Sequence, residues 1–484
     1  MSPARTKIAF AVCLVTILLA VLDTNIVSAA TVPIVRDLDP VHGMDKIPWL
    51  ISAFALASAA VLPLYGKLCD TIGAKKVFVG AIATFLLGSA LCGAAQSMGE
   101  LIAARAVQGV GGGGLMSVTM VVLAQLQAPG NGGGAGGGRG KGGSIGGVVA
   151  GAGMALGPWL GGTLADHADW RWIFYVNLPV GIAVLVGAAM VLRLPVTPVR
   201  HRIDFAGAAL AAAFSVSLLL VTEWGGKDYA WSSPQILGLA AASAAALALF
   251  LRRQTTAAEP ILPLSMFKVP AMRLGFAIQG LVGAAMMGTL VYVMIYLQVV
   301  RGIEATSAGL YLIPMAIGMT AVGIASERLA ARGWSQKTFV LAGSTAATAA
   351  LVLLATTGVS SSLWQIRGEL LLMGVGFGLL VGQLVLIVQQ AAPPRQLGVA
   401  TTGTRFFQTL GNALGTALFG TLLSRVYEAK GPGGSTSGLG ALRGPAHASG
   451  VQALTTGMDV VFVVGAVLMA AAAVLAARLP RQAG

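Results

Sequence analysis

Two charged residues lie inside long apolar runs of this sequence, and one of them, an acid, could carry a proton. Asp23 is in the run at 8–31, and Arg105 is in the run at 101–126. A charge placed in hydrocarbon needs a compensating partner or a function, because its insertion is costly. A carboxyl group that faces a permanent cation can hold or release a proton as the water around it changes. The pair is typical either of proton coupling, which we favour, or of a static ion pair that fixes helix packing.

The depth of each charge along its run places the two at a similar level. At about 1.5 Å per residue, Asp23 lies roughly 22 Å above the cytoplasmic start of its run, and Arg105 lies roughly 6 Å below the external start of its run. In a hydrocarbon core of about 30 Å, both fall in the outer half. Glu369 and Asp459, in the outer parts of two later runs, are further candidates for proton or substrate contact.

No set of residues typical of an enzyme or of a metal site is found. The four histidines are scattered, and Cys13, Cys69 and Cys92 have neither a metal-ligand spacing nor an even count. The glycine run around Lys141 lacks the Ser or Thr that a phosphate-binding loop needs at the next position, which is Gly142. We therefore expect no metal, no cofactor and no enzymatic activity, and a membrane-embedded enzyme is the less favoured alternative.

The composition predicts that lipid surrounds much of the chain. Of its 484 residues, 56% are hydrophobic and only 10% are charged, which is more apolar surface than one water-soluble core can hide. The formal net charge is +14, but Lys and Arg come singly or in small groups between apolar runs. This distribution argues against nucleic acid as a partner and indicates residence in a lipid bilayer.

Fourteen apolar runs are long enough to cross a bilayer, which takes about 20 residues each. They lie near 8–31, 48–69, 77–96, 101–126, 144–165, 172–194, 204–222, 235–251, 273–299, 306–326, 338–358, 363–390, 399–425 and 455–477. Alternate crossing places most of the 31 basic residues on one side, which predicts a multi-pass protein of a bacterial inner membrane with both termini cytoplasmic. A cleaved signal peptide ending near Ala29 is less favoured, because the first run is long and contains Asp23.

An internal repeat relates the first part of the chain to the last. The segment at 66–73, between the second and third runs, has a degraded counterpart at 323–329, after the tenth run. Arg105 at the start of the fourth run is likewise echoed by Arg367 at the start of the twelfth. Parallel repeats of this kind build transporters whose substrate site lies between two halves near the middle of the membrane.

The offset between the repeats predicts the domain organisation. We expect an all-α, polytopic transmembrane helix bundle with pseudo-symmetric six-helix halves at 1–194 and 273–484. Two additional central helices and a cytoplasmic linker occupy 195–272. The low-complexity stretches at 129–143 and 431–450 are expected to be loops.

A pattern of glycines and one proline in the fifth run predicts a bent, tightly packed helix. Small residues four positions apart let two backbones approach closely, and proline bends the helix because it lacks a hydrogen-bond donor. The residues are Gly153, Gly157, Pro158, Gly161 and Gly162. They match the antiporter motif GxxxGPxxGG, and the chain resembles the fourteen-helix drug:proton antiporters of the major facilitator superfamily, whose fold the resemblance implies.

A second segment carries the same resemblance. Residues 66–76, GKLCDTIGAKK, are similar to the cytoplasmic loop motif GxLaDrxGrkxx of that superfamily. Gly66, Asp70, Gly73 and Lys75 match the motif, whereas two of its basic positions hold Thr and Ala. The resemblance implies that Asp70 together with Lys75 latches the cytoplasmic side shut.

Three further segments resemble that family of antiporters. Arg105, Gln108 and Gly109 match its RxxQG motif, and the run at 170–181 is similar to a hallmark of the fourteen-helix members. The segment around Asp23 matches part of the pattern LDxTIVNVALP, with departures among the residues that follow. The resemblance implies that Asp23 and Arg105 serve proton or substrate coupling.

The residues and the resemblance together predict a function. We expect a monomeric, proton-coupled secondary transporter that exports small, largely apolar or cationic organic molecules, such as drugs or antibiotics, by alternating access. The proton gradient is its energy source, and its partners are the substrate, protons and the bilayer. An exporter or flippase of lipids, siderophores or metabolites on the same fold is the alternative.

Overall fold

The computed structural model describes residues 3–39, 43–127, 157, 160–161, 163–164, 168–192, 194, 204–226, 229–303, 305–432 and 444–480. Within these ranges every named element is a helix, and the only extended pairing is an isolated bridge between Gly225 and Tyr229. Ten stretches of the described chain are long and apolar enough to cross a membrane. One of them, Trp49–Ala94, contains parts of two α-helices joined by a short π-helix. The all-α class and the bundle of apolar helices are therefore confirmed.

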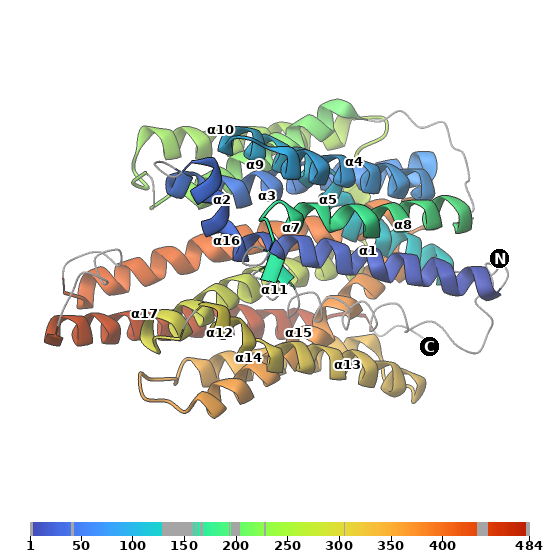
Figure 1. Cartoon of the computed structure of the whole chain (residues 1–484). Helices are drawn as coiled ribbons and strands as arrows, with labels where there is room; N and C mark the ends of the chain where they lie inside the picture. Colours follow the sequence, from blue (N-terminus) through green and yellow to red (C-terminus); the bar gives the residue numbers. More distant parts are fainter. Residues whose placement is uncertain are drawn as a thin grey trace. The chain divides into compact units, whose positions relative to one another are not determined.

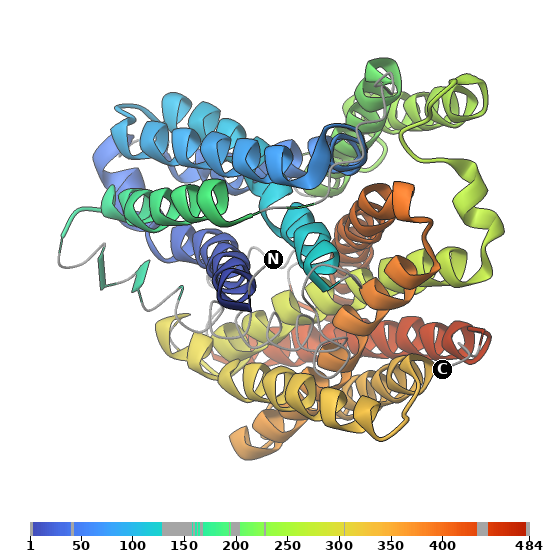
Figure 2. The same ribbon diagram turned by 90° about the vertical axis from the view of Figure 1, so that its right-hand side faces the viewer.

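One compact unit comprises Met1–Leu218, Leu239–Met272 and Val388–Phe406. Its elements, some of which continue beyond it, are α1 (Pro3–Ala29), α2 (Thr31–Leu38), α3 (Gly43–Leu68), η1 (Cys69–Gly73), α4 (Ala74–Ala94), α5 (Met98–Gln127), α7 (Trp172–Tyr175), α8 (Asn177–Val191), α9 (Phe205–Trp224), α10 (Pro234–Thr256), η2 (Leu264–Lys268), η4 (Pro394–Gln396) and the start of α16 (Leu397–Lys430). Within this unit α1, α4, α5 and α8 lie side by side (Figures 1 and 2).

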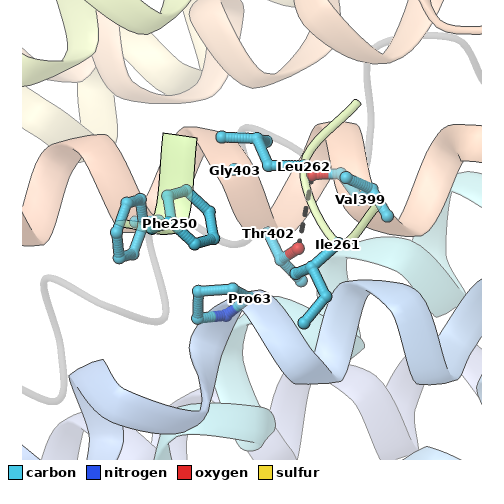
Figure 3. A pocket seen from close by; sticks show the side chains of 8 residues that line it. Pro63, Phe250, Ile261, Leu262, Val399, Thr402 and Gly403 are labelled. Carbon is cyan, nitrogen blue, oxygen red and sulfur yellow. Dashed lines mark hydrogen bonds between the residues drawn. The ribbon is translucent and has the colours of Figure 1, made fainter. Parts of the chain in front are cut away.

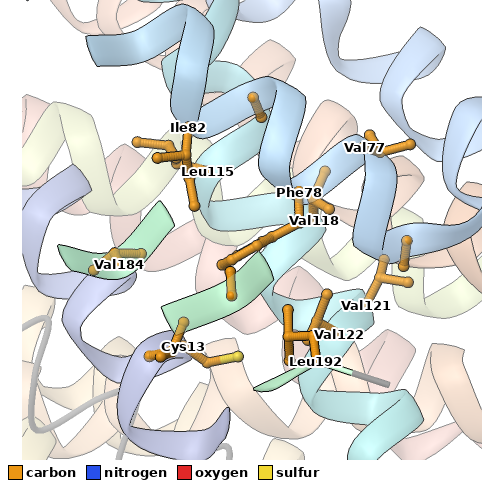
Figure 4. Close-up of a cluster of buried hydrophobic side chains, with 14 of the residues drawn as sticks. Cys13, Val77, Phe78, Ile82, Leu115, Val118, Val121, Val122, Val184 and Leu192 are labelled. Atoms are coloured by element: carbon orange, nitrogen blue, oxygen red, sulfur yellow. The ribbon is translucent and has the colours of Figure 1, made fainter. Parts of the chain in front are cut away.

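An apolar core holds these four helices together. Figure 4 shows some of its buried side chains, among them Cys13, Phe78, Val118 and Val184. Lipid tails are as apolar as these side chains, so close packing, more than the expulsion of water, drives the association. Gly88 of α4 makes the packing close, because a Cβ there would lie 2.6 Å from the Cβ of Gln108 on α5 and closer still to its backbone.

A smaller apolar cluster joins α2, α3, α5 and α7, and two polar contacts flank it. Its fully buried members include Ile34, Leu50 and Phe174. Beside it, the Asp37 carboxylate accepts hydrogen bonds from Trp170 Nε1 (3.0 Å) and Arg171 Nη1 (2.8 Å). These contacts fix the chain directly before α8 and so help to set the position at which α8 begins.

The other compact unit comprises Leu219–Gly238, Arg273–Ile387 and Phe407–Gly484. Its further elements are α11 (Pro270–Ile295), η3 (Tyr296–Val300), α12 (Ala305–Leu310), α13 (Ile313–Ala331), α14 (Gln336–Leu354), α15 (Leu363–Ala391) and α17 (Gly444–Ala477), together with the remainder of α16. The backbones of α11 and α16 come close where Gly280 faces Gly411, and the rings of Phe276 and Phe407 stack with centroids 5.2 Å apart. Small residues thus bring helices together here as well.

Two of the predicted boundaries are wrong. The loop expected at 431–450 is shorter, because α17 already begins at Gly444; Pro445, whose missing N–H costs nothing in a first helical turn, follows it. The single run at 306–326 is divided between α12 and α13, and Pro314 stands in the first turn of α13. Proline cannot donate to the preceding turn, so it starts a new helix there.

Other parts of the predicted organisation fall on residues without description. The loop at 129–143 and most of the run at 144–165 lie outside the described residues. The fourteen-span topology and the cytoplasmic termini therefore stay predictions. The division into 1–194, 195–272 and 273–484 likewise stays a prediction.

Candidate functional site

Asp23 lies near the end of α1 and is fully buried. Its carboxylate accepts three hydrogen bonds: from Arg105 Nη1 to Oδ2 (3.1 Å), and from Gln108 Nε2 (2.8 Å) and Asn177 Nδ2 (2.7 Å) to Oδ1. These donors come from α5 and from the first residue of α8. Three helices therefore converge on one carboxylate within the apolar bundle.

Arg105 is almost as deeply buried as Asp23, with 2% of its surface exposed. Its Nη1 also donates to Gln108 Oε1 (2.7 Å), and its Nε donates to the backbone carbonyl of Leu50 (3.4 Å). The guanidinium carbon lies 4.3 Å from the centre of the Phe54 ring, a cation–π geometry. The α3 helix thus contacts the cation through a backbone carbonyl and an aromatic ring.

Ser89 of α4 completes the buried network. Its Oγ accepts hydrogen bonds from Gln108 Nε2 (2.7 Å) and from Asn177 Nδ2 (3.0 Å). Both amide groups therefore divide their two hydrogens between Asp23 and Ser89, and the four side chains form a closed ring. We call Asp23, Ser89, Arg105, Gln108 and Asn177 the buried polar network.

The network suits an ionised Asp23. A carboxylate only accepts hydrogen bonds, and three donors point at this one, whereas a protonated carboxyl would need an acceptor for its hydrogen. Removing one partner of a buried ion pair costs about 3–5 kcal/mol, because it leaves an uncompensated charge. Protonation of Asp23 therefore requires the network to rearrange, and this requirement links the charge of Asp23 to the conformation of four helices.

The motif at residues 66–76, which we call the gate motif after its expected role, contacts the start of α16. The Asp70 carboxylate accepts hydrogen bonds from the backbone N–H groups of Gly398 (2.7 Å) and Val399 (2.9 Å). These amides belong to the first turn of α16, where N–H groups have no helical partner and the helix dipole favours a negative charge. We call this interaction the gate contact. At Gly66 a Cβ would lie 2.9 Å from the Cα of Val399, so only glycine allows the approach.

The other two residues of this motif have separate partners. Gly73 ends the π-helix η1 with φ of 92°, a conformation that glycine adopts without strain. Lys75 Nζ donates to the carbonyl of Ala189 (2.7 Å) in the last turn of α8, where a cation is favourable. Asp70 and Lys75 thus contact two different helices, and their joint action as a latch stays a prediction.

The antiporter motif is described only in part. Gly157 and Gly161 are helical and buried. Gly153, Pro158 and Gly162 lie outside the described residues. The predicted bend and the close packing of this helix stay predictions.

Glu369 and Asp459 lie in the second compact unit. Glu369 on α15 is buried, and its carboxylate accepts hydrogen bonds from Thr357 Oγ1 (3.0 Å) and Gln365 Nε2 (2.8 Å). Asp459 on α17 is half-buried. Both acids belong to a different compact unit from the buried polar network.

Comparison with known sequences assigns the family. The sequence profile of the Major Facilitator Superfamily matches residues 12–416. The chain belongs to the Major Facilitator Superfamily. The resemblance seen in its motifs is thereby confirmed at the level of the superfamily.

Relatives of this Major Facilitator Superfamily protein include proteins named for multidrug transport and multidrug resistance. An uncharacterized MFS-type transporter of Mycobacterium tuberculosis is 36% identical over 90% of this chain, which spans only 62% of the length of that relative. The multidrug transporter protein MdtP of Bacillus subtilis is 33% identical over 83% of this chain and 72% of its own length. Multidrug resistance protein 3 of Bacillus subtilis is 32% identical over 88% of this chain and 81% of its own length.

Solved structures show the same fold. The proton:xylose symporter XylE covers 100% of this Major Facilitator Superfamily chain and matches over 97% of its own, with a TM-score of 0.68 and 14% identity. The human organic anion transporter MFSD10 (TETRAN) covers 97% of this chain and matches over 100% of its own, with a TM-score of 0.65 and 17% identity. At these identities the likeness extends to the fold alone.

Sequence reasoning missed part of the site of this superfamily member. Ser89 stands in an apolar run and resembles an ordinary packing residue. Asn177 lies within the run at 170–181, whose resemblance to the fourteen-helix antiporters assigns it no role. Both are polar residues inside predicted spans, and that signal could have marked them, because such residues need hydrogen-bond partners in the membrane.

Proposed function

We propose that this protein is a proton-coupled exporter of small, largely apolar or cationic organic molecules that works by alternating access in a bacterial inner membrane. The observation that carries the proposal is the fully buried Asp23 carboxylate, held by Arg105, Gln108 and Asn177. The relatives named for multidrug transport and multidrug resistance support the substrate class, and a relative named as an MFS-type efflux pump supports the direction. A monomer driven by the proton gradient, without cofactor or enzymatic step, fits membership of a superfamily of transporters.

In this proposal Asp23 alternates between two states. In the described conformation it is ionised and paired with Arg105. When the surrounding helices move and water reaches the site, Arg105 is released, and Asp23 takes up a proton. A cationic substrate that then binds favours the ionised carboxylate, so its arrival drives the proton off. The cargo and the proton then move in opposite directions, because the same carboxylate serves both.

The test uses purified protein in proteoliposomes with an imposed pH gradient and ethidium as the probe. Asp23→Asn keeps the shape of the side chain but cannot titrate, so we expect normal insertion and the loss of gradient-driven export. Asp23→Glu should retain part of the export, with a shifted pH optimum. Asp39→Asn is the matched control, because Asp39 is ion-paired with Lys46 at the surface and such pairs contribute little.

Two outcomes would contradict the proposal. If Asp23→Asn exports ethidium at the normal rate with unchanged pH dependence, Asp23 is only a structural partner of Arg105. The coupling carboxylate must then be sought at Glu369 or Asp459. If the wild-type protein moves lipids, siderophores or metabolites independently of the gradient, the alternative of a flippase or metabolite exporter replaces the antiporter.

A further inference from the structure

The segment that follows α10 is ion-paired with the gate motif. Glu259 Oε2 lies 3.1 Å from Lys67 Nζ, and the two side chains are only 25% and 13% exposed. Lys67 stands between Gly66, which lies against α16, and Asp70, which makes the gate contact. A carboxylate from this segment therefore holds the second residue of the gate motif. We call residues 257–263 the linker segment.

The same segment packs against α16. A small apolar pocket is bounded by Pro63 of α3, Phe250 of α10, Ile261 and Leu262 of the linker segment, and residues from α16 (Figure 3). Ile261 is fully buried and Leu262 is 8% exposed. The side chains around this pocket therefore pack the linker segment against α16.

The α16 residues of this pocket form one stripe along the helix. The stripe consists of Val399, Thr402, Gly403 and Phe406, which follow the i, i+3, i+4, i+7 spacing of a single helical face. Val399 also donates its backbone N–H to Asp70, and Thr402 flanks Gly66. The first turns of α16 are thus held by the gate motif and by the linker segment at once.

The linker segment is itself anchored to the two additional helices. The backbone N–H of Leu262 donates to Gln254 Oε1 (3.0 Å) on α10. The neighbouring Arg253 Nε donates to Asp204 Oδ1 (3.0 Å), which also accepts the N–H of Gly207 in the first turn of α9. A displacement of the linker segment is therefore transmitted to α9 and α10.

We propose that the linker segment is a second latch on the cytoplasmic gate, with Glu259 as the positioning residue that holds Lys67 while Ile261 and Leu262 hold α16. Opening the gate separates α16 from Asp70 and also from this latch. The additional helices α9 and α10 thus bias the opening equilibrium without touching the substrate. The inference rests on alternating access, as in the proposed function, but not on proton coupling.

The protein carries its own reporter for this proposal. Cys69 lies in η1 beside Asp70 and is 2% exposed, so it should react with N-ethylmaleimide only when the gate opens. Alkylation at Cys69 is followed by peptide mass spectrometry on the full chain in nanodiscs, without substrate or pH gradient. Cys13, which belongs to the same apolar cluster as Cys69, and Cys92, which belongs to another, are fully buried and report unfolding, because an unfolded variant would expose all three thiols.

We expect Glu259→Gln to accelerate alkylation of Cys69 by about two- to fivefold, the size expected for a partly exposed ion pair, with Cys13 and Cys92 unchanged. Leu262→Ala should act in the same direction, and Asp70→Asn should accelerate it more. Exchanging the charges, with Glu259→Lys and Lys67→Glu together, should restore the slow rate. Glu428→Gln, an exposed acid at the end of α16, should change nothing.

Two results would overturn the latch. If Asp70→Asn accelerates alkylation while Glu259→Gln and Leu262→Ala do not, the gate exists without a second latch. If none of the three variants accelerates it, the gate contact itself does not control access to Cys69, and the latch falls with it. Loss of proton coupling in Asp23→Asn leaves this readout unaffected, so the failure of the proposed function and the failure of the latch remain distinguishable.

Discussion

Gly88 of α4 offers a test of the site that changes none of its polar groups. A Cβ at this position would lie 2.6 Å from the Cβ of Gln108 and closer to its backbone N and Cα, whereas ordinary contact begins at 3.4 Å. Because the obstacle is backbone, no rotamer change relieves it, and Gly88→Ala must push α5 away from α4. Overpacking of this kind costs about 1–3 kcal/mol, against a gain of about 1 kcal/mol from the better helix propensity of alanine.

The displacement reaches the buried polar network through Gln108. Its hydrogen bonds to Asp23 (2.8 Å) and Ser89 (2.7 Å) cannot survive a shift approaching 1 Å with good geometry. Misplacement on this scale can lower the rate of a positioned reaction strongly, so we expect gradient-driven ethidium export to fall about tenfold or more. The Gly88→Ala variant should also unfold at a lower temperature in detergent, as measured by fluorescence-detected size exclusion.

Gly80→Ala is the matched control, since Gly80 lies on the same helix and a Cβ there would meet nothing within 4 Å. This variant should be at least as stable as the wild type and should export normally. The reasoning is refuted if Gly88→Ala matches Gly80→Ala in both unfolding temperature and export.

Two further predictions concern other parts of the molecule. The hydrogen bond from Trp170, together with Arg171, lowers the pKa of Asp37 from its ordinary value of 3.8, so this contact stabilises the folded state above that value and is lost only as pH falls below it. Asp37→Asn should therefore leave the shape of the export profile between about pH 5 and pH 8 unchanged; a shifted profile would contradict this assignment. In the antiporter motif, Gly157→Leu places a bulky side chain at a buried helical position, so export should fall and proton leak, followed with a pH dye in proteoliposomes, should rise while membrane insertion continues. Unchanged export and leak would show that the motif only fills space.

The depth of the charged residues along their helices could be predicted from the sequence. The helical rise is constant, so counting residues places Asp23 and Arg105 at a similar depth, and the structure puts their side chains 3.1 Å apart. Glu369 and Asp459 were found by the same reasoning, which identifies any acid in an apolar run. Depth alone does not tell which helices are neighbours. For that reason it could not show that these two acids belong to a different compact unit from Asp23 and Arg105.

Contacts that depend on helix rotation were not predictable in this way. Ser89 meets Gln108 and Asn177 only because Gly88 lets α4 approach α5 and because α8 begins at Asn177. The partners of Asp70 are backbone amides of α16, and any sequence supplies such amides. The sequence therefore predicts that the Asp70 carboxylate matters, whereas the identity of its hydrogen-bond donors is known only from the tertiary structure.

The closed ring of the buried polar network also decides how protons can travel. A proton wire needs members that accept a hydrogen on one side and pass another on, as water and hydroxyl groups do. In this ring Gln108 and Asn177 use their nitrogen atoms only as donors, toward Asp23 and Ser89, so no hydrogen can be relayed around it. In the described conformation the ring therefore cannot transfer a proton, and a proton can reach Asp23 only after water enters the site.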